Sequence, residues 1–260
     1  MTFQPFVPTG GLSGWRFLQS TLETQKAAFD RGPVLQRDLD YFRENIGNIT
    51  TPEALVSDFR LLSVALGAFG LSEDINSKFL IRTVLEEGTI DPEALSNRLS
   101  DKRYRDLSRA FGFGDFAVPN TAISTFPDQI ERAYLDRSFE VAVGQSDETM
   151  RLALNARREL PALAEGDDSQ RTKWFTLMGT APLRTVMEGA LSLPTAFATL
   201  PIDRQLEEFQ SRAESILGTS DLSELSSEPN LDRLLDRYTA IAGTQVAAPT
   251  SPALVLLRGF

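Results

Sequence analysis

Two pairs of neighbouring acids, Glu86-Glu87 and Asp167-Asp168, could in principle support acid-base chemistry in this sequence. Paired carboxylates act as catalysts when both converge on one substrate. Successive helical residues point about 100° apart, so Glu86 and Glu87 are not expected to converge. Asp167 and Asp168 precede a predicted helix and are explained as its cap. A carboxylate-based enzyme is therefore kept only as a minor alternative.

The sequence contains no histidine and no cysteine. Without histidine it lacks the commonest general base and metal ligand, and every Ser-His or Cys-His nucleophile pair. Without cysteine, disulfides, thiolate nucleophiles and zinc–thiolate sites are excluded. The sequence also lacks the calcium-loop and phosphate-loop patterns. We therefore expect no enzymatic activity, no catalytic, cofactor-binding or metal-binding residues, no cofactor and no small-molecule substrate.

The balance of charge limits the partners. Asp and Glu number 36 against 26 Lys and Arg, which gives a formal net charge of −10. This charge repels phosphate backbones, so we expect no nucleic-acid partner. The first residues lack the cationic and apolar regions of a cleaved signal peptide, and no apolar run is long enough to span a bilayer. We expect no membrane insertion.

Apolar residues recur at helical spacing between helix caps along most of the chain, which predicts an all-α fold of about ten to thirteen helices. Thr51-Pro52-Glu53 predicts a helix start, and Gly70 predicts its end. The inward face of this helix is predicted to carry Leu55, Phe59, Leu62, Leu66 and Phe69. Ser72 is predicted to begin the next helix, which runs to Glu87 with Ile75, Phe79, Val84 and Leu85 inward.

An internal duplication is predicted from a second pattern. Residues 82–110 align with residues 184–212 without a gap, and RTVLE (82–86) matches RTVME (184–188). We expect a flexible N-terminus and helical arm over 1–47, a first helical unit over 48–120, a second, diverged unit over 121–243 and a C-terminal tail over 244–260. Similar helix punctuation in unrelated segments is the alternative.

Two segments within these units have specific interpretations. FGFGDFAVPN (111–120) is interpreted as a helix C-cap followed by a hinge, because glycine and proline interrupt it. The charged run from Asp101 to Asp106 is interpreted as a solvated helix face. Alternatively, Arg82 with Asp101, and their counterparts Arg184 with Asp203, form ion pairs that fix the helices of each unit.

Partner binding is predicted at the two ends of the chain. Trp15, Leu18 and Leu22 form a narrow apolar stripe on a predicted helix that ends near Asp30. Leu256, Leu257 and Phe260 stand in a short apolar C-terminal run. Apolar side chains that a short segment cannot bury often bind a partner protein or a second copy of the chain. The alternative is that both ends pack back onto the body.

Four segments are similar to a family of uncharacterised alphaproteobacterial proteins, a domain of unknown function often encoded among flagellar genes. These segments are GWRFLQSTLETQKAAFDRGPVLQRDLDYFREN (14–45), VSDFRLLSVALGAFGL (56–71), KFLIRTVLEEG (78–88) and ALSNRLSDKRYRDLSRAFGFG (94–114). The resemblance covers residues 12–115, and the second half matches more weakly. It brings no activity, cofactor or catalytic residue.

The resemblance implies association with the flagellum. We therefore expect a non-enzymatic structural or protein-interaction protein that acts through helix-mediated contacts. It is expected in the cytoplasm, or exported to the bacterial flagellum without a cleaved signal peptide. The alternative to a structural role is a cytoplasmic adaptor or export chaperone, whose acidic surface would shield a partner before assembly.

Overall fold

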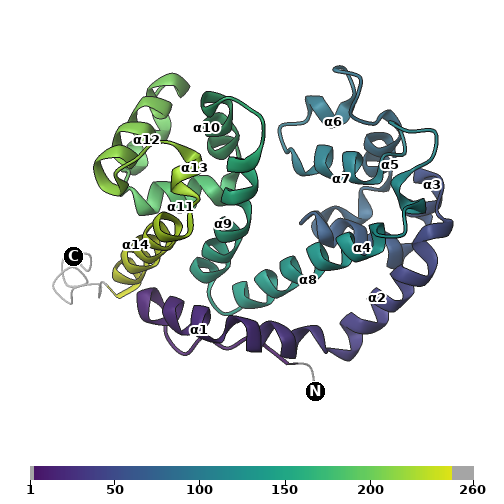
Figure 1. Ribbon diagram of the computed structural model, residues 1–260, viewed down its shortest axis with the longest axis horizontal. Helices are drawn as coiled ribbons and strands as arrows, with labels where there is room; N and C mark the ends of the chain where they lie inside the picture. Colours follow the sequence, from purple (N-terminus) through teal and green to yellow (C-terminus); the bar gives the residue numbers. More distant parts are fainter. Residues whose placement is uncertain (1–2, 248–260) are drawn as a thin grey trace, which may run out of the picture. The chain divides into compact units, whose positions relative to one another are not determined.

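The computed structural model describes the backbone of residues 3–247, with the side chains of Thr195 and residues 245–247 left out. These residues form fourteen α-helices and four short 3-10 helices, with no strand among them (Figure 1). The prediction of an all-α fold is confirmed. No helix in the described part is both long enough and apolar enough to cross a bilayer.

The helices gather into two compact units. Unit 1 is built mainly from Thr24–Ala142, and unit 2 from Phe6–Glu23 and the described residues that begin at Val143. These units do not follow the predicted limits after residues 47 and 120. The physical reason is that two long helices, α1 (Gly11–Asp30) and α8 (Phe126–Gly144), each supply residues to both units. The predicted arm is therefore divided between them.

Unit 1 begins with the end of α1 and finishes with most of α8. Between them the chain forms α2 (Pro33–Asn45), η1 (Ile46–Asn48), α3 (Pro52–Ser57), α4 (Phe59–Ala68), η2 (Ser72–Asn76), α5 (Lys78–Glu87), α6 (Leu95–Arg98), α7 (Arg103–Phe111) and η3 (Asn120–Ala122). Local chemistry sets several of these limits as predicted. The Thr51 side chain accepts a hydrogen bond from the Ala54 amide, and Gly112 ends α7 in the left-handed conformation.

A break at Asp58 corrects the predicted helix from Thr51 to Gly70. Asp58 has extended backbone angles, and its side chain accepts hydrogen bonds from the amides of Arg60 and Leu61, so it caps a new helix. The apolar face predicted across this point is therefore interrupted. Phe59, expected in the core, lies in the first turn of α4 with 62% of its surface exposed. Gly70 has φ +70°, as expected for a residue that follows a helix end.

A second break, at Ser77, separates η2 from α5. Ser77 is not helical (φ −84°, ψ 41°), so the face that carries Ile75 does not continue to Phe79. Phe79 was predicted to point inward, but it is 74% exposed. Val84 and Leu85 on the same helix are fully buried, as predicted. The predicted inward face of α5 is therefore wrong for Phe79 in the first turn of this helix, where the chain changes direction after Ser77.

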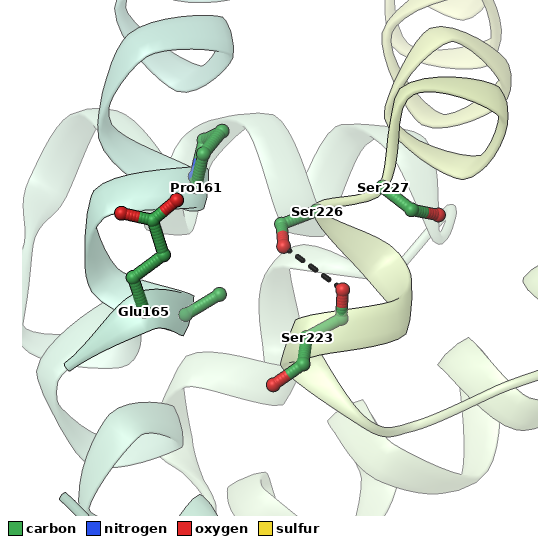
Figure 2. Close-up of a pocket in the computed structure, with 6 residues that line it drawn as sticks. Pro161, Glu165, Ser223, Ser226 and Ser227 are labelled. Atoms are coloured by element: carbon green, nitrogen blue, oxygen red, sulfur yellow. Dashed lines mark hydrogen bonds between the residues drawn. The ribbon is translucent and has the colours of Figure 1, made fainter. Parts of the chain in front are cut away.

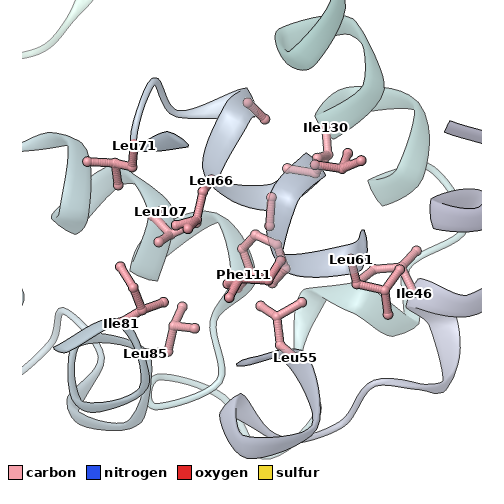
Figure 3. Packing of buried hydrophobic residues seen from close by; sticks show 14 of the residues in the cluster. Ile46, Leu55, Leu61, Leu66, Leu71, Ile81, Leu85, Leu107, Phe111 and Ile130 are labelled. Carbon is pink, nitrogen blue, oxygen red and sulfur yellow. The ribbon is translucent and has the colours of Figure 1, made fainter. Parts of the chain in front are cut away.

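The core of unit 1 draws side chains from most of its helices. Figure 3 shows residues of α3, α4, α5, α7 and α8 pointing into a shared interior around Phe111. Phe111 is fully buried, and its ring meets that of Phe126 edge-on at 5.0 Å between centroids. Because Ile130 and Phe126 of α8 belong to this core, the first part of α8 is an integral element of unit 1.

Unit 2 combines the first part of α1 with the second half of the chain. Its helices are α9 (Glu148–Glu165), α10 (Gln170–Gly179), α11 (Ala181–Ala190), η4 (Thr195–Thr199), α12 (Ile202–Leu217), α13 (Leu222–Leu225) and α14 (Glu228–Ala247). α11 packs against α9, α10 and α14. The core contains Trp15, Trp174 and Phe209, all fully buried.

The ends of α4 and α11 have the same geometry. Gly67-Ala68 ends α4 and Gly189-Ala190 ends α11, and each is followed by a left-handed residue, Gly70 or Ser192. The next leucine amide then bonds back into the helix, from Leu71 to Leu66 and from Leu193 to Glu188. This places α4, and not α5, in the position of α11, so the aligned segments 82–86 and 184–188 lie in helices with different surroundings. The internal duplication stays a prediction.

Under this correspondence, unit 1 has a segment without a counterpart in unit 2. Residues 77–102, which form α5 and α6, stand between η2 and α7. Only Leu200 and Pro201 stand between η4 and α12. Unit 1 is therefore distinguished from unit 2 by the α5–α6 segment.

Candidate functional site

The predicted N-terminal contact residues lie in the interior of unit 2. Trp15 and Leu18 have no exposed surface, and Leu22 is half-buried. Both buried side chains contribute to packing, and a direct contact with a partner would require α1 to leave the unit. The alternative that this end packs back on the body matches the observed burial. Leu256, Leu257 and Phe260 lie outside the described residues, so their role stays a prediction.

The acidic pairs do not form a shared site. Glu86 pairs with Arg82 of its own helix at 3.5 Å, whereas Glu87 accepts a hydrogen bond from the Leu95 amide at 2.5 Å. Asp167 and Asp168 are exposed, and α10 is capped by Ser169, whose hydroxyl accepts from the Thr172 amide. A cap was predicted here from Asp167 and Asp168, but Ser169 supplies it.

The alternative ion pairs are not formed either. Arg82 donates to Glu53 at 2.8 Å, and Asp101 accepts from Arg103. Arg184 pairs with Glu188, and Asp203 pairs with Arg171. The aligned residues therefore satisfy their charges with other neighbours.

A surface pocket of about 380 Å³ lies between α9 and α13 in unit 2. Figure 2 shows Pro161 and Glu165 on one side and three serines on the other. Ser226 Oγ donates to the Ser223 carbonyl at 3.0 Å, and Ser227 Oγ donates to the Glu224 carbonyl at 2.6 Å. Both hydroxyls therefore donate to backbone carbonyls of their own segment and not to the Glu165 carboxylate, the arrangement that would activate a serine as a nucleophile.

A smaller groove of about 210 Å³ lies between α3 and α5 in unit 1. Its lining residues are Glu53, Val56, Ser57, Lys78, Phe79 and Arg82. Glu53, the acid among them, is paired with Arg82. Burial raises the pKa of two carboxyls elsewhere in unit 1, Asp30 and Glu131, but neither lines this groove. The groove therefore offers no converging carboxylates for acid-base chemistry.

A more distinctive feature of unit 1 is an exposed apolar surface made by Ile90, Phe116 and Val118, which we call the Ile90–Phe116 surface. Ile90 is 73% exposed, Phe116 55% and Val118 68%. Ile90 follows α5, and the other two belong to the loop after α7. Apolar side chains exposed on neighbouring loops are unfavourable for an isolated protein in water and are typical of binding surfaces.

The side chain of Asp115 joins the two parts of this surface. Its carboxylate accepts hydrogen bonds from the Thr89 amide at 2.6 Å, the Thr89 hydroxyl at 2.8 Å and the Ile90 amide at 3.1 Å. Asp115 therefore holds the backbone of Ile90 beside the backbone that carries Phe116. Three hydrogen bonds to one carboxylate fix this arrangement strongly.

Two glycines allow the close approach of the loops. A side-chain carbon on Gly114 would lie 2.4 Å from the Gly88 amide nitrogen, and one on Gly112 would lie 2.6 Å from the Phe116 ring. Neither position could hold a larger residue without a shift of its neighbours. The segment 111–120, interpreted as a hinge from its glycines, is thus docked inside unit 1, and its C-cap at Gly112 is confirmed.

Acidic side chains accompany the Ile90–Phe116 surface. Glu87, Asp91 and Glu93 stand within three residues of Ile90, and all are exposed. Asp91 accepts a hydrogen bond from the Glu93 amide at 2.9 Å. Within the described residues, none of these three carboxylates pairs with a cation. Three carboxylates without an ion-pair partner therefore accompany Ile90.

The described residues define an all-α protein of two helical units. Residues 68–230 match the family described as "Protein of unknown function (DUF1217)", and the chain belongs to this family. The match runs from the last residue of α4 into α14, further into the second half than the resemblance over residues 12–115. None of the curated proteins compared with the chain matches it.

The fold is also similar to that of a protein from Agrobacterium tumefaciens, an alphaproteobacterium, whose crystal structure is known. The two share 22% sequence identity with a TM-score of 0.74, over 93% of this chain and 99% of the other. At this level of identity the similarity supports the fold alone.

Proposed function

We propose that the chain is a non-enzymatic interaction protein that binds a protein partner through the helical surface of unit 1. The observation that carries this proposal is the exposed Ile90–Phe116 surface, fixed in place by Asp115. A surface already held in its binding geometry loses little conformational entropy on association. The proposal thus moves the contact from the N-terminal helix to the α5 region.

We further propose that this binding takes place in association with the bacterial flagellum. The support is the resemblance to a family often encoded among flagellar genes; the family match over residues 68–230 carries no function of its own. Two roles are compatible with this proposal: a structural component of the flagellum, and a cytoplasmic adaptor or export chaperone. Cell fractionation distinguishes them, because an adaptor stays in the cytoplasm and a component is recovered with the filament or basal body.

The proposal is tested by cross-linking and affinity purification from flagellated cells of the source bacterium. The full chain is compared with a Phe116→Ser, Val118→Ser double variant. The matched control is Phe59→Ser, which replaces another exposed phenylalanine of unit 1 outside this surface. We expect one flagellar protein to be lost with the double variant and kept with the control. Capture of the same proteins by all three forms would contradict the proposal.

A further inference from the structure

The chemistry of the Ile90–Phe116 surface indicates which kind of partner it fits. Its Ile90 portion lies in the α5–α6 segment, residues 77–102, between η2 and α7. The core of unit 1 uses Ile81, Val84 and Leu85 from α5, but Ile90 remains outside. The segment thus contributes both to the core and to an uncovered apolar surface.

Three acids that neighbour Ile90 in the sequence have no cationic partner among the described residues. Glu87, Asp91 and Glu93 make no ion pair with a described residue, whereas Asp101 of the same unit pairs with Arg103 at 2.6 Å. An apolar contact surface accompanied by carboxylates that lack a cationic partner is complementary to apolar residues flanked by cations. The net charge of −10 acts in the same direction, since it attracts basic segments and repels acidic ones.

The backbone around the surface is held by hydrogen bonds that leave the apolar side chains free. Asp115 binds Thr89 and Ile90, and Asn97 Nδ2 donates to the carbonyls of Thr89 at 2.9 Å and Asp91 at 2.7 Å. Asn120 Nδ2 donates to the Ala110 carbonyl at 2.9 Å and secures the other loop. These contacts fix the two loops relative to each other before any partner arrives.

We propose that the Ile90–Phe116 surface binds a basic amphipathic helix of a partner protein. The helix would lay apolar residues at i, i+3 and i+4 on Ile90, Phe116 and Val118, and place lysine or arginine toward Glu87, Asp91 and Glu93. This inference rests on the proposed function and adds the chemical class of the partner segment. A short helix suits the surface because three apolar side chains correspond to about one or two helical turns.

Random peptides displayed on phage and selected on the purified, intact protein test this inference. The selected sequences are expected to combine helically spaced apolar residues with lysine or arginine. Binding of the best synthetic peptide is then measured by fluorescence anisotropy. We expect Phe116→Ser to weaken it about ten-fold or more, as for a central apolar contact, and the Phe59→Ser control to leave it unchanged. Higher salt should weaken binding as well.

A charge-reversed variant supplies the sharper readout. Asp91→Lys with Glu93→Lys should select acidic peptides in place of basic ones, and should bind the original peptide much more weakly. Both side chains are exposed, and circular dichroism checks that the variant keeps its helices. A change in preferred charge cannot result from simple loss of folding.

Several results would overturn the inference. They are an absence of enriched peptides, enriched peptides without basic residues, and peptides that bind the charge-reversed variant equally well. If a synthetic peptide of residues 248–260 binds instead with the same dependence on Phe116, the occupant is a segment of this chain. If Phe116→Ser abolishes a dimer seen by sedimentation, the occupant is a second copy.

The failure of this inference is distinguishable from that of the proposed function. If a cellular partner is lost with the Phe116→Ser, Val118→Ser variant but is unaffected by charge reversal, the proposed function stands and the basic helix is excluded. If binding of every cellular partner is unaffected by either variant, both the proposed function and the basic-helix inference are excluded.

Discussion

Arg237 donates a hydrogen bond from Nε to the carbonyl oxygen of Ala190, 2.6 Å away, at the C-terminus of α11. Arg137 makes the equivalent bond to Ala68, at 2.7 Å, at the end of α4. In each unit an arginine on one helix thus satisfies a terminal carbonyl of a central helix, where the helix dipole favours positive charge.

Replacement of Arg237 is expected to destabilise unit 2. Arg237→Met leaves the Ala190 carbonyl without its charged donor, and the free energy of unfolding should fall by about 1.5–3 kcal/mol. Urea unfolding followed by tryptophan fluorescence measures this, because both tryptophans, Trp15 and Trp174, are buried in unit 2. The control is Arg204→Met, which removes an ion pair with a 72% exposed arginine and should cost less than about 1 kcal/mol. Equal effects of the two changes would contradict the prediction.

A methyl group at Gly67 is expected to destabilise unit 1, although alanine favours helix. Its Cβ would lie 2.5 Å from Cε2 of the Tyr134 ring, in a buried contact between α4 and α8. Gly67→Ala should therefore lower the free energy of unfolding by about 1–3 kcal/mol. Gly179→Ala is the matched control, because no atom lies within 4 Å of the added carbon, and it should stabilise unit 2 by about 0.4–1 kcal/mol. Unfolding is followed by circular dichroism, and a Gly67→Ala protein as stable as the control would refute the steric explanation.

The cap at Asp58 is expected to make the stability of unit 1 depend on pH. Burial raises the pKa of this carboxyl, but hydrogen bonds from Tyr41 and from the amides of Leu61 and Arg60, with the Arg60 charge, bring the pKa below 3.8. Between the folded pKa and 3.8, the unfolded chain binds more protons than the folded one. The stabilisation is therefore complete above the unfolded pKa and is lost as pH falls through the folded pKa.

Asp58→Ala tests this dependence. At pH 7 it should lower the free energy of unfolding by about 0.5–2 kcal/mol, the usual cost of a lost helix cap. The difference from the unaltered protein should shrink as pH is lowered below 4, in urea titrations followed by circular dichroism. Tyr41→Phe removes the 2.6 Å hydrogen bond to the carboxylate but keeps both amide bonds, so it should show a weaker pH dependence. A difference that is constant from pH 7 to pH 3 would exclude Asp58 as the source.

Trp15 is expected to act in folding. Trp15→Ala removes a fully buried side chain and should cost about 3–5 kcal/mol, with Trp174 as the remaining fluorescent reporter of unit 2. The half-buried Leu22 should be less sensitive, so Leu22→Ala should cost less. If Trp15→Ala leaves unfolding unchanged but removes a cellular partner, α1 leaves the unit on binding and the sequence-based contact prediction holds.

Helix limits set by local chemistry could be predicted from the sequence. Thr51 and Gly112 cap their helices as expected. These features depend on residues within one or two turns, and their hydrogen bonds form wherever the helix lies. The break at Asp58 was missed because aspartate in a continuous apolar pattern can be read either as an exposed helical residue or as a cap.

The candidate site could be predicted only in part. The glycines and phenylalanines of residues 111–120 marked that segment as unusual, and Phe116 and Val118 belong to it. Nothing in the sequence joins it to Ile90, because the bonds from Asp115 to Thr89 and Ile90 connect residues far apart in the chain.

The sequence by itself determined that this protein is helical, acidic and without histidine or cysteine chemistry, since these properties follow from residue types and local spacing. The tertiary structure decided where each apolar side chain lies. The stripe of Trp15 and Leu18 indicates a buried face on α1, but only packing shows that this face is buried in unit 2. Phe79 and Ile90 have the same apolar character, yet both remain exposed: Phe79 follows the break at Ser77, and Ile90 lies beyond the end of α5 at Glu87. Burial is a property of long-range contacts, which helical periodicity does not encode.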